Sequence, residues 1–290
     1  MPPTLSTLRT GDRLDRRLPA GQPPGQATLA AFAMAGAPDQ REVRTLLEAL
    51  GRHAGVLEVG LPYSDPWLDG PVVAEAGAEA LRAGFRTADL FPLVEMLRVR
   101  TPAAITVMSY WNPVRAFGPP DFARRLAEAG GSAVLLPDLP VEEAEPWLDA
   151  AHQYGIRTSF LVSPDCSPRR LALVAAAADG FLYLPAARAV SGHRGGLDVP
   201  IGEAVRRLRQ ACGLPVAAGI GITCPQQAVA LARTVDCVVV GSAFLRLTQA
   251  DPGPGGIRAA EALAAGFARA LRPQRPTGDP GAAPVPFPPA

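Results

Sequence analysis

Lysine is missing from this sequence of 290 residues: all 28 basic side chains counted as lysine or arginine are arginines. This absence excludes a Schiff-base mechanism through a lysine of this chain. Positive and negative charges nearly balance, to a formal net charge of +1, which argues against a strongly basic nucleic-acid-binding protein. With 48% hydrophobic and 19% charged residues, the composition is that of a globular protein and not of a disordered or fibrous chain.

Long apolar runs and paired cysteine motifs are also absent. The longest uncharged apolar stretches, such as 237–244, span about eight residues, whereas a bilayer-spanning helix needs ~20. The first residues, Met1-Pro2-Pro3, do not resemble a signal peptide. The four cysteines are irregularly spaced and form no Cys-x-x-Cys pair, which predicts neither a zinc site nor a disulfide framework. We therefore expect reduced thiols, no bound metal, and a cytoplasmic protein that binds neither membranes nor nucleic acid.

Proline is concentrated at the two ends of the chain. Residues 271–290 contain seven prolines and residues 1–25 contain five. Because proline cannot sustain a helix interior or a central strand, we expect a flexible N-terminal extension over 1–25 and a disordered tail over 271–290. The arginine-rich piece 13–17 predicts at most a short helix, and more simply a solvated charged segment. A single domain over 26–270 remains.

Within this domain, short apolar runs alternate with longer amphipathic segments rich in alanine, leucine and arginine. This pattern is typical of parallel strands that are each followed by a covering helix. Eight such units in about 240 residues favour a closed (β/α)₈ TIM barrel over a six-stranded open sheet. The predicted strands are 29–34, 56–60, 104–108, 133–136, 158–162, 180–184, 215–218 and 237–240. The predicted helices are 40–51, 71–83, 88–99, 120–130, 141–154, 168–178, 199–211, 224–233 and 257–270.

Two carboxylates lie where such a barrel places its functional residues, at the C-terminal end of a strand. Glu58 interrupts the apolar strand 56–60, where poor hydration would raise the pKa of its carboxyl and let it carry a proton near neutrality. A glutamate paired with an arginine is an equally good interpretation. Asp69 lies on the loop that leaves the same strand, although Asp69-Gly70 alone indicates a turn. Together the two carboxylates indicate an acid/base site.

Glycine turns follow the last two predicted strands, at 219–221 and at Gly241-Ser242-Ala243. Glycines let backbone N–H groups approach an anion, and the N-terminus of a following helix favours its charge. The two turns therefore predict a phosphorylated substrate. A dinucleotide-binding fingerprint is excluded, because Cys224 stands where that motif requires glycine or alanine.

A segment rich in alanine, glycine and arginine, 183–196, begins at the end of the sixth predicted strand. It indicates either a mobile lid over a ligand or a plain disordered loop. Tyr183, at its start, contacts substrate or packs in the core. The three histidines are scattered, and no spacing places two of them as metal ligands.

Several motifs resemble the tryptophan synthase alpha chain family over about residues 28–250. The most specific one runs through Glu58-Val59-Gly60, 62–66 and Asp69-Gly70-Pro71, and further matches fall at 108–113, 137–143, 190–192, 219–222 and 241–243. The resemblance implies a (β/α)₈ barrel. It also implies retro-aldol cleavage of indole-3-glycerol phosphate to indole and glyceraldehyde 3-phosphate, a step of tryptophan biosynthesis that uses no metal or cofactor on this chain.

The same resemblance assigns roles to individual residues. Glu58 matches the family's general acid/base, and Asp69 matches the carboxylate that stabilises the indole N–H as positive charge develops. Phe32 and Ile220 fall at positions that line the indole pocket. The residues expected to bind substrate are Phe32, Tyr110, Tyr183, Ser191, Gly192, Ile220, Gly221, Gly241 and Ser242, of which Gly192, Gly221, Gly241 and Ser242 match the phosphate cradle.

A partner is implied as well: a pyridoxal-phosphate β chain, in an α2β2 heterotetramer, with Asp65 at the position of an interface acid. Some residues depart from the family pattern, including 34–38, the bulky Trp67 and Leu68, and Ala189 in the lid. Three alternatives therefore stay open. The chain could be a stand-alone indole-producing lyase of a specialised pathway, a non-catalytic barrel that activates a β subunit, or another phosphosugar barrel such as an isomerase.

Overall fold

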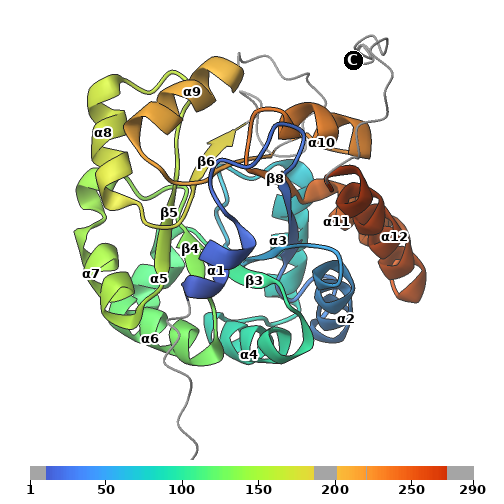
Figure 1. The fold of residues 1–290 in the computed structure, drawn as a ribbon. Helices are drawn as coiled ribbons and strands as arrows, with labels where there is room; N and C mark the ends of the chain where they lie inside the picture. The colour runs from blue at the N-terminus through green and yellow to red at the C-terminus, as the bar shows by residue number, and fades with distance from the viewer. Residues whose placement is uncertain (1–10, 186–200, 220, 273–290) are drawn as a thin grey trace, which may run out of the picture.

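A computed structural model of the chain describes residues 11–185, 201–219 and 221–272. Within these residues, eight strands form a closed barrel in chain order, and each strand pairs in parallel with its neighbours (Figure 1). The (β/α)₈ prediction is confirmed. The strands are β1 (Thr28–Met34), β2 (Val56–Gly60), β3 (Ala104–Met108), β4 (Ala133–Leu135), β5 (Arg157–Leu161), β6 (Leu182–Pro185), β7 (Val216–Gly219) and β8 (Cys237–Val240).

Helices surround the barrel and follow the strands (Figure 1). None of the described helices is long and apolar enough to cross a membrane. The α-helices are α1 (Asp12–Arg17), α2 (Gln40–Gly51), α3 (Pro71–Arg82), α4 (Leu90–Arg100), α5 (Trp111–Phe117), α6 (Pro119–Ala129), α7 (Glu145–Tyr154), α8 (Pro168–Ala177), α9 (Ile201–Ala211), α10 (Pro225–Ala232), α11 (Ser242–Ala250) and α12 (Pro254–Ala270). Two 3₁₀ turns, η1 (Thr87–Asp89) and η2 (Val141–Glu143), precede α4 and α7.

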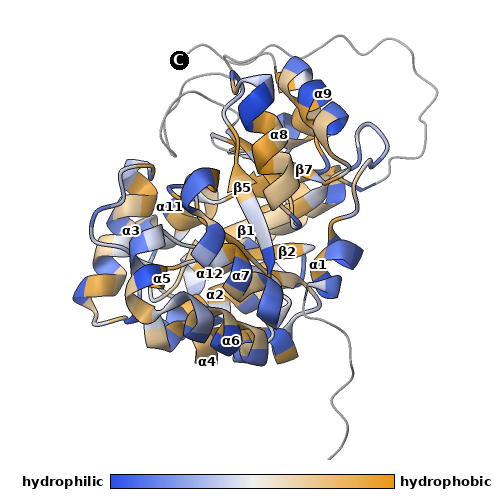
Figure 2. Cartoon of the chain, turned by 90° about the vertical axis from the view of Figure 1, so that its left-hand side faces the viewer, coloured by the Kyte–Doolittle hydropathy of each residue, from blue (hydrophilic) through white to orange (hydrophobic). Residues whose placement is uncertain are grey.

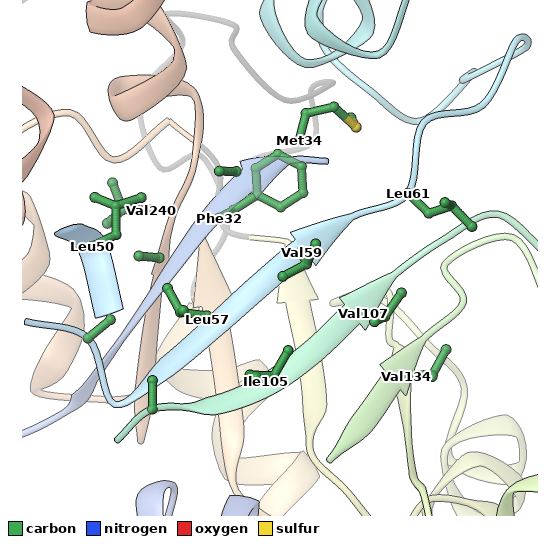
Figure 3. Close-up of a cluster of buried hydrophobic side chains, with 14 of the residues drawn as sticks. Phe32, Met34, Leu50, Leu57, Val59, Leu61, Ile105, Val107, Val134 and Val240 are labelled. Carbon is green, nitrogen blue, oxygen red and sulfur yellow. The ribbon is translucent and has the colours of Figure 1, made fainter. Parts of the chain in front are cut away.

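The strands are apolar on both faces, because one face fills the barrel and the other packs against the helices. Leu57 and Val59 of β2 lie in register with Ile105 and Val107 of β3, and all four belong to the core between barrel and helices (Figure 3). The alternate position, Glu58, therefore faces the barrel interior.

The covering helices follow from their apolar periodicity. In α2 the buried residues Val43, Leu46 and Leu50 recur every three or four positions, which places them on one face of the helix. Asp39 caps this helix, since its carboxylate accepts hydrogen bonds from the backbone N–H groups of Arg41 and Glu42, at 2.7 and 2.8 Å. Figure 2 shows both hydrophilic and hydrophobic residues on outer helices such as α6 and α7.

Residues 11–25 differ from the solvated, flexible segment expected. Helix α1 lies across the N-terminal end of the barrel (Figure 1), and Leu14 and Leu18, each 2% exposed, pack with interior residues of the strands. Asp15 forms an ion pair with Arg157 at 2.6 Å. The expectation rested on the charged residues of this segment. The four-residue spacing of the two leucines, which puts both on one helical face, indicated the packing.

Element boundaries agree with the predictions to within two residues for every strand. The predictions include no helix range for α5 or α11, although the Gly241 turn was expected to lead into a helix. They join η2 and α7 into one helix, and they place the start of α12 three residues late, at 257 and not at Pro254. The predictions for residues 1–10 and 273–290 lie outside the described residues.

Candidate active site

A pocket with about 470 Å³ of empty space lies at the C-terminal end of the barrel. Its walls come from β1, β2, β3, β6 and β8, from the loops that follow β2, β7 and β8, and from the first turns of α3 and α11. Chain closure thus brings together residues that lie far apart in the sequence. The predicted site residues that line it are Phe32, Glu58, Asp69, Tyr183, Gly221, Gly241 and Ser242.

Glu58 lies on the third residue of β2 and is only 3% exposed. Burial, and secondarily the negative charge of Asp69, raises the pKa of its carboxyl to about 7. No arginine forms an ion pair with it among the described residues, so the alternative interpretation of a paired glutamate finds no support there. A carboxyl with this pKa can both donate and accept a proton at neutral pH.

Asp69 lies on the loop between β2 and α3 and is half-buried. Burial raises the pKa of its carboxyl to about 7 as well. Because two negative charges in one pocket repel each other, Glu58 and Asp69 titrate as a pair, and the first proton to leave makes the second harder to remove. The site therefore holds one protonated and one ionised carboxyl near neutrality.

Tyr110, expected to bind substrate, is not one of the residues that line the pocket. It is buried, and its hydroxyl oxygen accepts a hydrogen bond from the backbone N–H of Leu68 at 2.9 Å. Its ring also contacts Tyr63, with ring centroids 5.1 Å apart. The contacts of Tyr110 thus hold the loop that carries Asp69.

Phe32 packs against two glycines, Gly60 at the end of β2 and Gly241 in the pocket wall. A Cβ at Gly60 would lie 2.6 Å from the Phe32 ring, and one at Gly241 would lie 3.0 Å from it. At these distances a side chain at either position would collide with the Phe32 ring, so the ring needs glycine at both positions. Gly221 has φ +79°, a left-handed conformation that favours glycine.

The turn at Gly241 leads directly into α11, whose first residue is Ser242. The first backbone N–H groups of a helix have no partner within the helix, and they carry partial positive charge. Both residues line the pocket, so this helix start is placed to receive an anionic group.

Tyr183 lies on β6 and is buried in the pocket wall. Burial, followed by the charge of Glu58, raises the pKa of its phenol well above the usual value. The hydroxyl therefore stays protonated at neutral pH and is available as a hydrogen-bond donor.

Three predicted site residues, Ser191, Gly192 and Ile220, lie outside the described residues. Sequence reasoning also missed four apolar lining residues, because it searched for chemically distinctive side chains. The alternation of side chains along a strand could have identified one of them. Val239 lies two positions before Gly241, so the two residues face the same side of the sheet. The four are Val73, Met108, Ile222 and Val239. Among the described residues, no group of three or more His, Cys, Asp and Glu is placed to hold a metal ion.

A closed (β/α)₈ barrel with two proton-carrying carboxyl groups beside a helix N-terminus falls in the class of barrel enzymes that do acid/base chemistry on an anionic substrate. A family model described as "Tryptophan synthase alpha chain" matches residues 20–269. The chain belongs to the tryptophan synthase alpha chain family, and it is accordingly a carbon–carbon lyase of tryptophan biosynthesis that cleaves indole-3-glycerol phosphate to indole and glyceraldehyde 3-phosphate.

Individual relatives match over most of their length. The tryptophan synthase alpha chain of Streptomyces coelicolor is 40% identical over 263 residues, which cover 90% of this chain and 97% of the relative. That of Deinococcus radiodurans is 37% identical over 270 residues, or 92% and 98% of the two chains. A structure of Mycobacterium tuberculosis tryptophan synthase superposes with a TM-score of 0.81 at 34% identity, covering 93% of this chain and all of that one.

Proposed function

We propose that Glu58 and Asp69 carry out the cleavage of indole-3-glycerol phosphate in this chain. The observation that carries the proposal is that both carboxyl groups line one pocket and that burial raises the pKa of each to about 7. The reaction needs a group that gives a proton and takes one back, and it needs a second group that tolerates positive charge.

In the proposed mechanism, protonated Glu58 first donates its proton to C3 of the indole ring. The ring becomes an indoleninium, and ionised Asp69 accepts a hydrogen bond from its N–H and stabilises the positive charge. The carboxylate of Glu58 then takes the proton of the hydroxyl on the carbon attached to the ring. The carbon–carbon bond breaks, its electrons return to the ring, and the former alcohol leaves as the aldehyde of glyceraldehyde 3-phosphate. Glu58 ends in its starting protonation state.

The rest of the pocket supports a bound substrate in one orientation. We place the phosphate at Gly241 and Ser242, at the start of α11, with the Gly221 turn beside it. The indole ring would contact Phe32 and the apolar wall at Val239. We also propose that Ser191, Gly192 and Ile220 complete the phosphate cradle and the indole pocket.

We propose residues 26–270 as the lyase domain, and the cytoplasm as its compartment. The free thiols of the four cysteines support the second point, since cytoplasmic proteins keep thiols reduced. Residues 11–25 pack beneath this domain as part of the same body.

A β chain is the proposed partner, bound near the loop between β2 and α3. One similar structure, at a TM-score of 0.75 and 30% identity, is that of the tryptophan synthase a2b2 complex from Pyrococcus furiosus. In this chain the same loop carries Trp67, which is 68% exposed, beside the exposed Asp65. An exposed tryptophan on the loop that carries Asp69 supports a contact with another protein at this place.

Steady-state indole release from indole-3-glycerol phosphate tests the proposal. We expect Glu58→Gln and Asp69→Asn each to lower kcat about 10²- to 10⁴-fold, while the exposed Glu75→Gln on α3 leaves it unchanged. Full activity of Glu58→Gln would contradict the assignment.

The same assay with and without a β chain tests the partner. Slow release that accelerates when the β chain is added is the expected result for an alpha subunit. Rapid release by the isolated chain, unchanged by the β chain, would identify a stand-alone indole-producing lyase and overturn the proposed partnership.

A further inference from the structure

Thr106 of β3 lies directly beside Glu58. The two residues are partners in the parallel register of β2 and β3, so their side chains project from the same face of the sheet. That face is the barrel interior: Val56 and Ala104, two positions earlier on each strand, belong to the cluster that fills it. Thr106 is fully buried.

The hydroxyl of Thr106 has no hydrogen-bond partner within the described part of the chain and no contact with solvent. Two other buried hydroxyls, both on β5, are partnered. Thr158 accepts a hydrogen bond from the indole N–H of Trp147 at 3.1 Å, and Ser159 accepts one from the backbone N–H of Phe181 at 3.1 Å. Burying an unpaired hydroxyl costs stability, and valine would fill the same volume without that cost. An unpaired hydroxyl at this position is therefore explained best by a neighbouring group whose protonation state changes and which forms a hydrogen bond with it.

We propose that Thr106 is a positioning residue for Glu58, whose carboxylate accepts a hydrogen bond from the Thr106 hydroxyl and whose protonated form donates one to it. The inference rests on the proposed role of Glu58 as general acid/base. A hydroxyl is both donor and acceptor, so it can follow Glu58 through both protonation states of the reaction. An apolar neighbour would hold neither state in place.

Three other titratable groups face Glu58, from three elements: Asp69 on the loop after β2, Tyr183 on β6 and Cys237 on β8. Burial and the charge of Glu58 raise the pKa of both Tyr183 and Cys237, so these two stay neutral while Glu58 titrates. Asp69 titrates in the same range as Glu58. Thr106 adds no charge of its own, so its removal changes the titration of the carboxyl pair through the hydrogen bond.

The direction of that change follows from the strength of the bond. A hydrogen bond to a carboxylate is stronger than one to a neutral carboxyl, so the Thr106 hydroxyl favours ionised Glu58. Without it, the pKa of Glu58 rises further. Because Thr106 does not line the pocket, its loss leaves substrate binding intact and lowers the rate of the chemical step.

The test compares Thr106→Val with Thr106→Ser in the full chain, by pH profiles of kcat and kcat/KM for indole release. Because the reaction starts from protonated Glu58, we expect Thr106→Val to move the alkaline limb of the profile to higher pH by about one unit. We also expect it to lower kcat about tenfold with KM unchanged. Thr106→Ser keeps the hydroxyl and restores the profile.

Ser132→Ala is the matched control. The Ser132 hydroxyl is also buried without a partner in the described residues, but it is one residue out of phase with the interior-facing Ala133. Its removal should leave the pH profile unchanged.

An unchanged profile and kcat in Thr106→Val would overturn the inference, most clearly if the variant also melts at a higher temperature. If Thr106→Val folds poorly, Thr106→Ala removes the same hydroxyl without adding bulk and carries the same expectation. The benchmark is Glu58→Gln. If it remains active, the proposed function fails; if it is inactive while Thr106→Val behaves as wild type, the inference about Thr106 alone fails.

Discussion

At the scale of single residues, the site depends on a carboxyl group held where water does not reach. Glu58 stands between the apolar residues of β2 and is almost fully buried. Its raised pKa means that ionising this carboxyl costs more free energy in the folded chain than in the unfolded chain. The acid/base role proposed for Glu58 therefore uses a group that is unfavourable for folding.

This cost predicts how stability depends on pH. The folded-state pKa of Glu58 is about 7 and its ordinary value is 4.5, so between these values the folded chain holds more protons than the unfolded one. The contribution is fully favourable below pH 4.5 and is lost as the pH rises through about 7. We expect the free energy of unfolding of Glu58→Gln, relative to that of wild type, to increase by about 2 kcal/mol from pH 5 to pH 8. Urea denaturation at a series of pH values measures this. A difference that does not change with pH would contradict this.

At the scale of elements, successive loops at the C-terminal end of the barrel hold one another. The backbone N–H of Leu68, after β2, donates to the hydroxyl of Tyr110, after β3. The backbone N–H of Trp111, at the start of α5, donates to the carboxylate of Asp138, after β4, at 2.8 Å. The position of Asp69 therefore depends on loops of two neighbouring strands as well as on its own.

Tyr110→Phe tests this coupling. The ring stays buried, but the N–H of Leu68 loses its acceptor, at a cost of about 1 kcal/mol. We expect faster amide hydrogen exchange at Leu68 and a kcat lowered about tenfold, because Asp69 is held less firmly. Tyr63→Phe is the matched control, since the Tyr63 hydroxyl accepts a weaker, exposed hydrogen bond from Asn112 at 3.3 Å. Unchanged exchange at Leu68 in Tyr110→Phe would refute the coupling.

At the scale of the whole molecule, the two ends of the barrel have different tasks. The C-terminal end carries the pocket, and the N-terminal end is covered by α1. The segment after α1 continues this cover, because the backbone N–H of Gln22 donates to the buried carboxylate of Asp236 at 3.0 Å. Stability and chemistry are therefore separated by the length of the strands.

Leu14→Ala should reveal this separation. Its side chain is buried under the barrel, so we expect a loss of about 2–4 kcal/mol in the free energy of unfolding, measured with urea. The kcat for indole release, measured well below the melting temperature, should not change. Leu173→Ala on α8, where the leucine is 47% exposed, is the control and should cost much less. A lowered kcat in a folded Leu14→Ala chain would show that the two ends are coupled.

Local pattern was sufficient for the order of elements and for the central acid. Alternation of apolar runs with amphipathic segments predicted the barrel, and strand β2 was bounded correctly at 56–60. A single carboxylate in that apolar run was enough to mark Glu58, because strand residues alternate between two faces and both faces of a barrel strand are dry. The glycine turns after β7 and β8 were also found from the sequence, because an anion-binding turn needs only a few consecutive residues, with glycine just before a helix.

Tertiary structure alone decided which of these local features meet. Tyr110 supports the Asp69 loop across two strands, Phe32 fits against glycines of β2 and of the turn after β8, and Thr106 lies in register with Glu58. The packing of Leu14 beneath the barrel belongs here too. A periodic pattern extends over 10 to 15 residues, whereas these contacts form when the sheet closes and sets the register of strands that are distant in the chain. The sequence by itself therefore determined the elements and the place of Glu58 in an apolar strand, and barrel closure determined the surroundings that raise the pKa of its carboxyl.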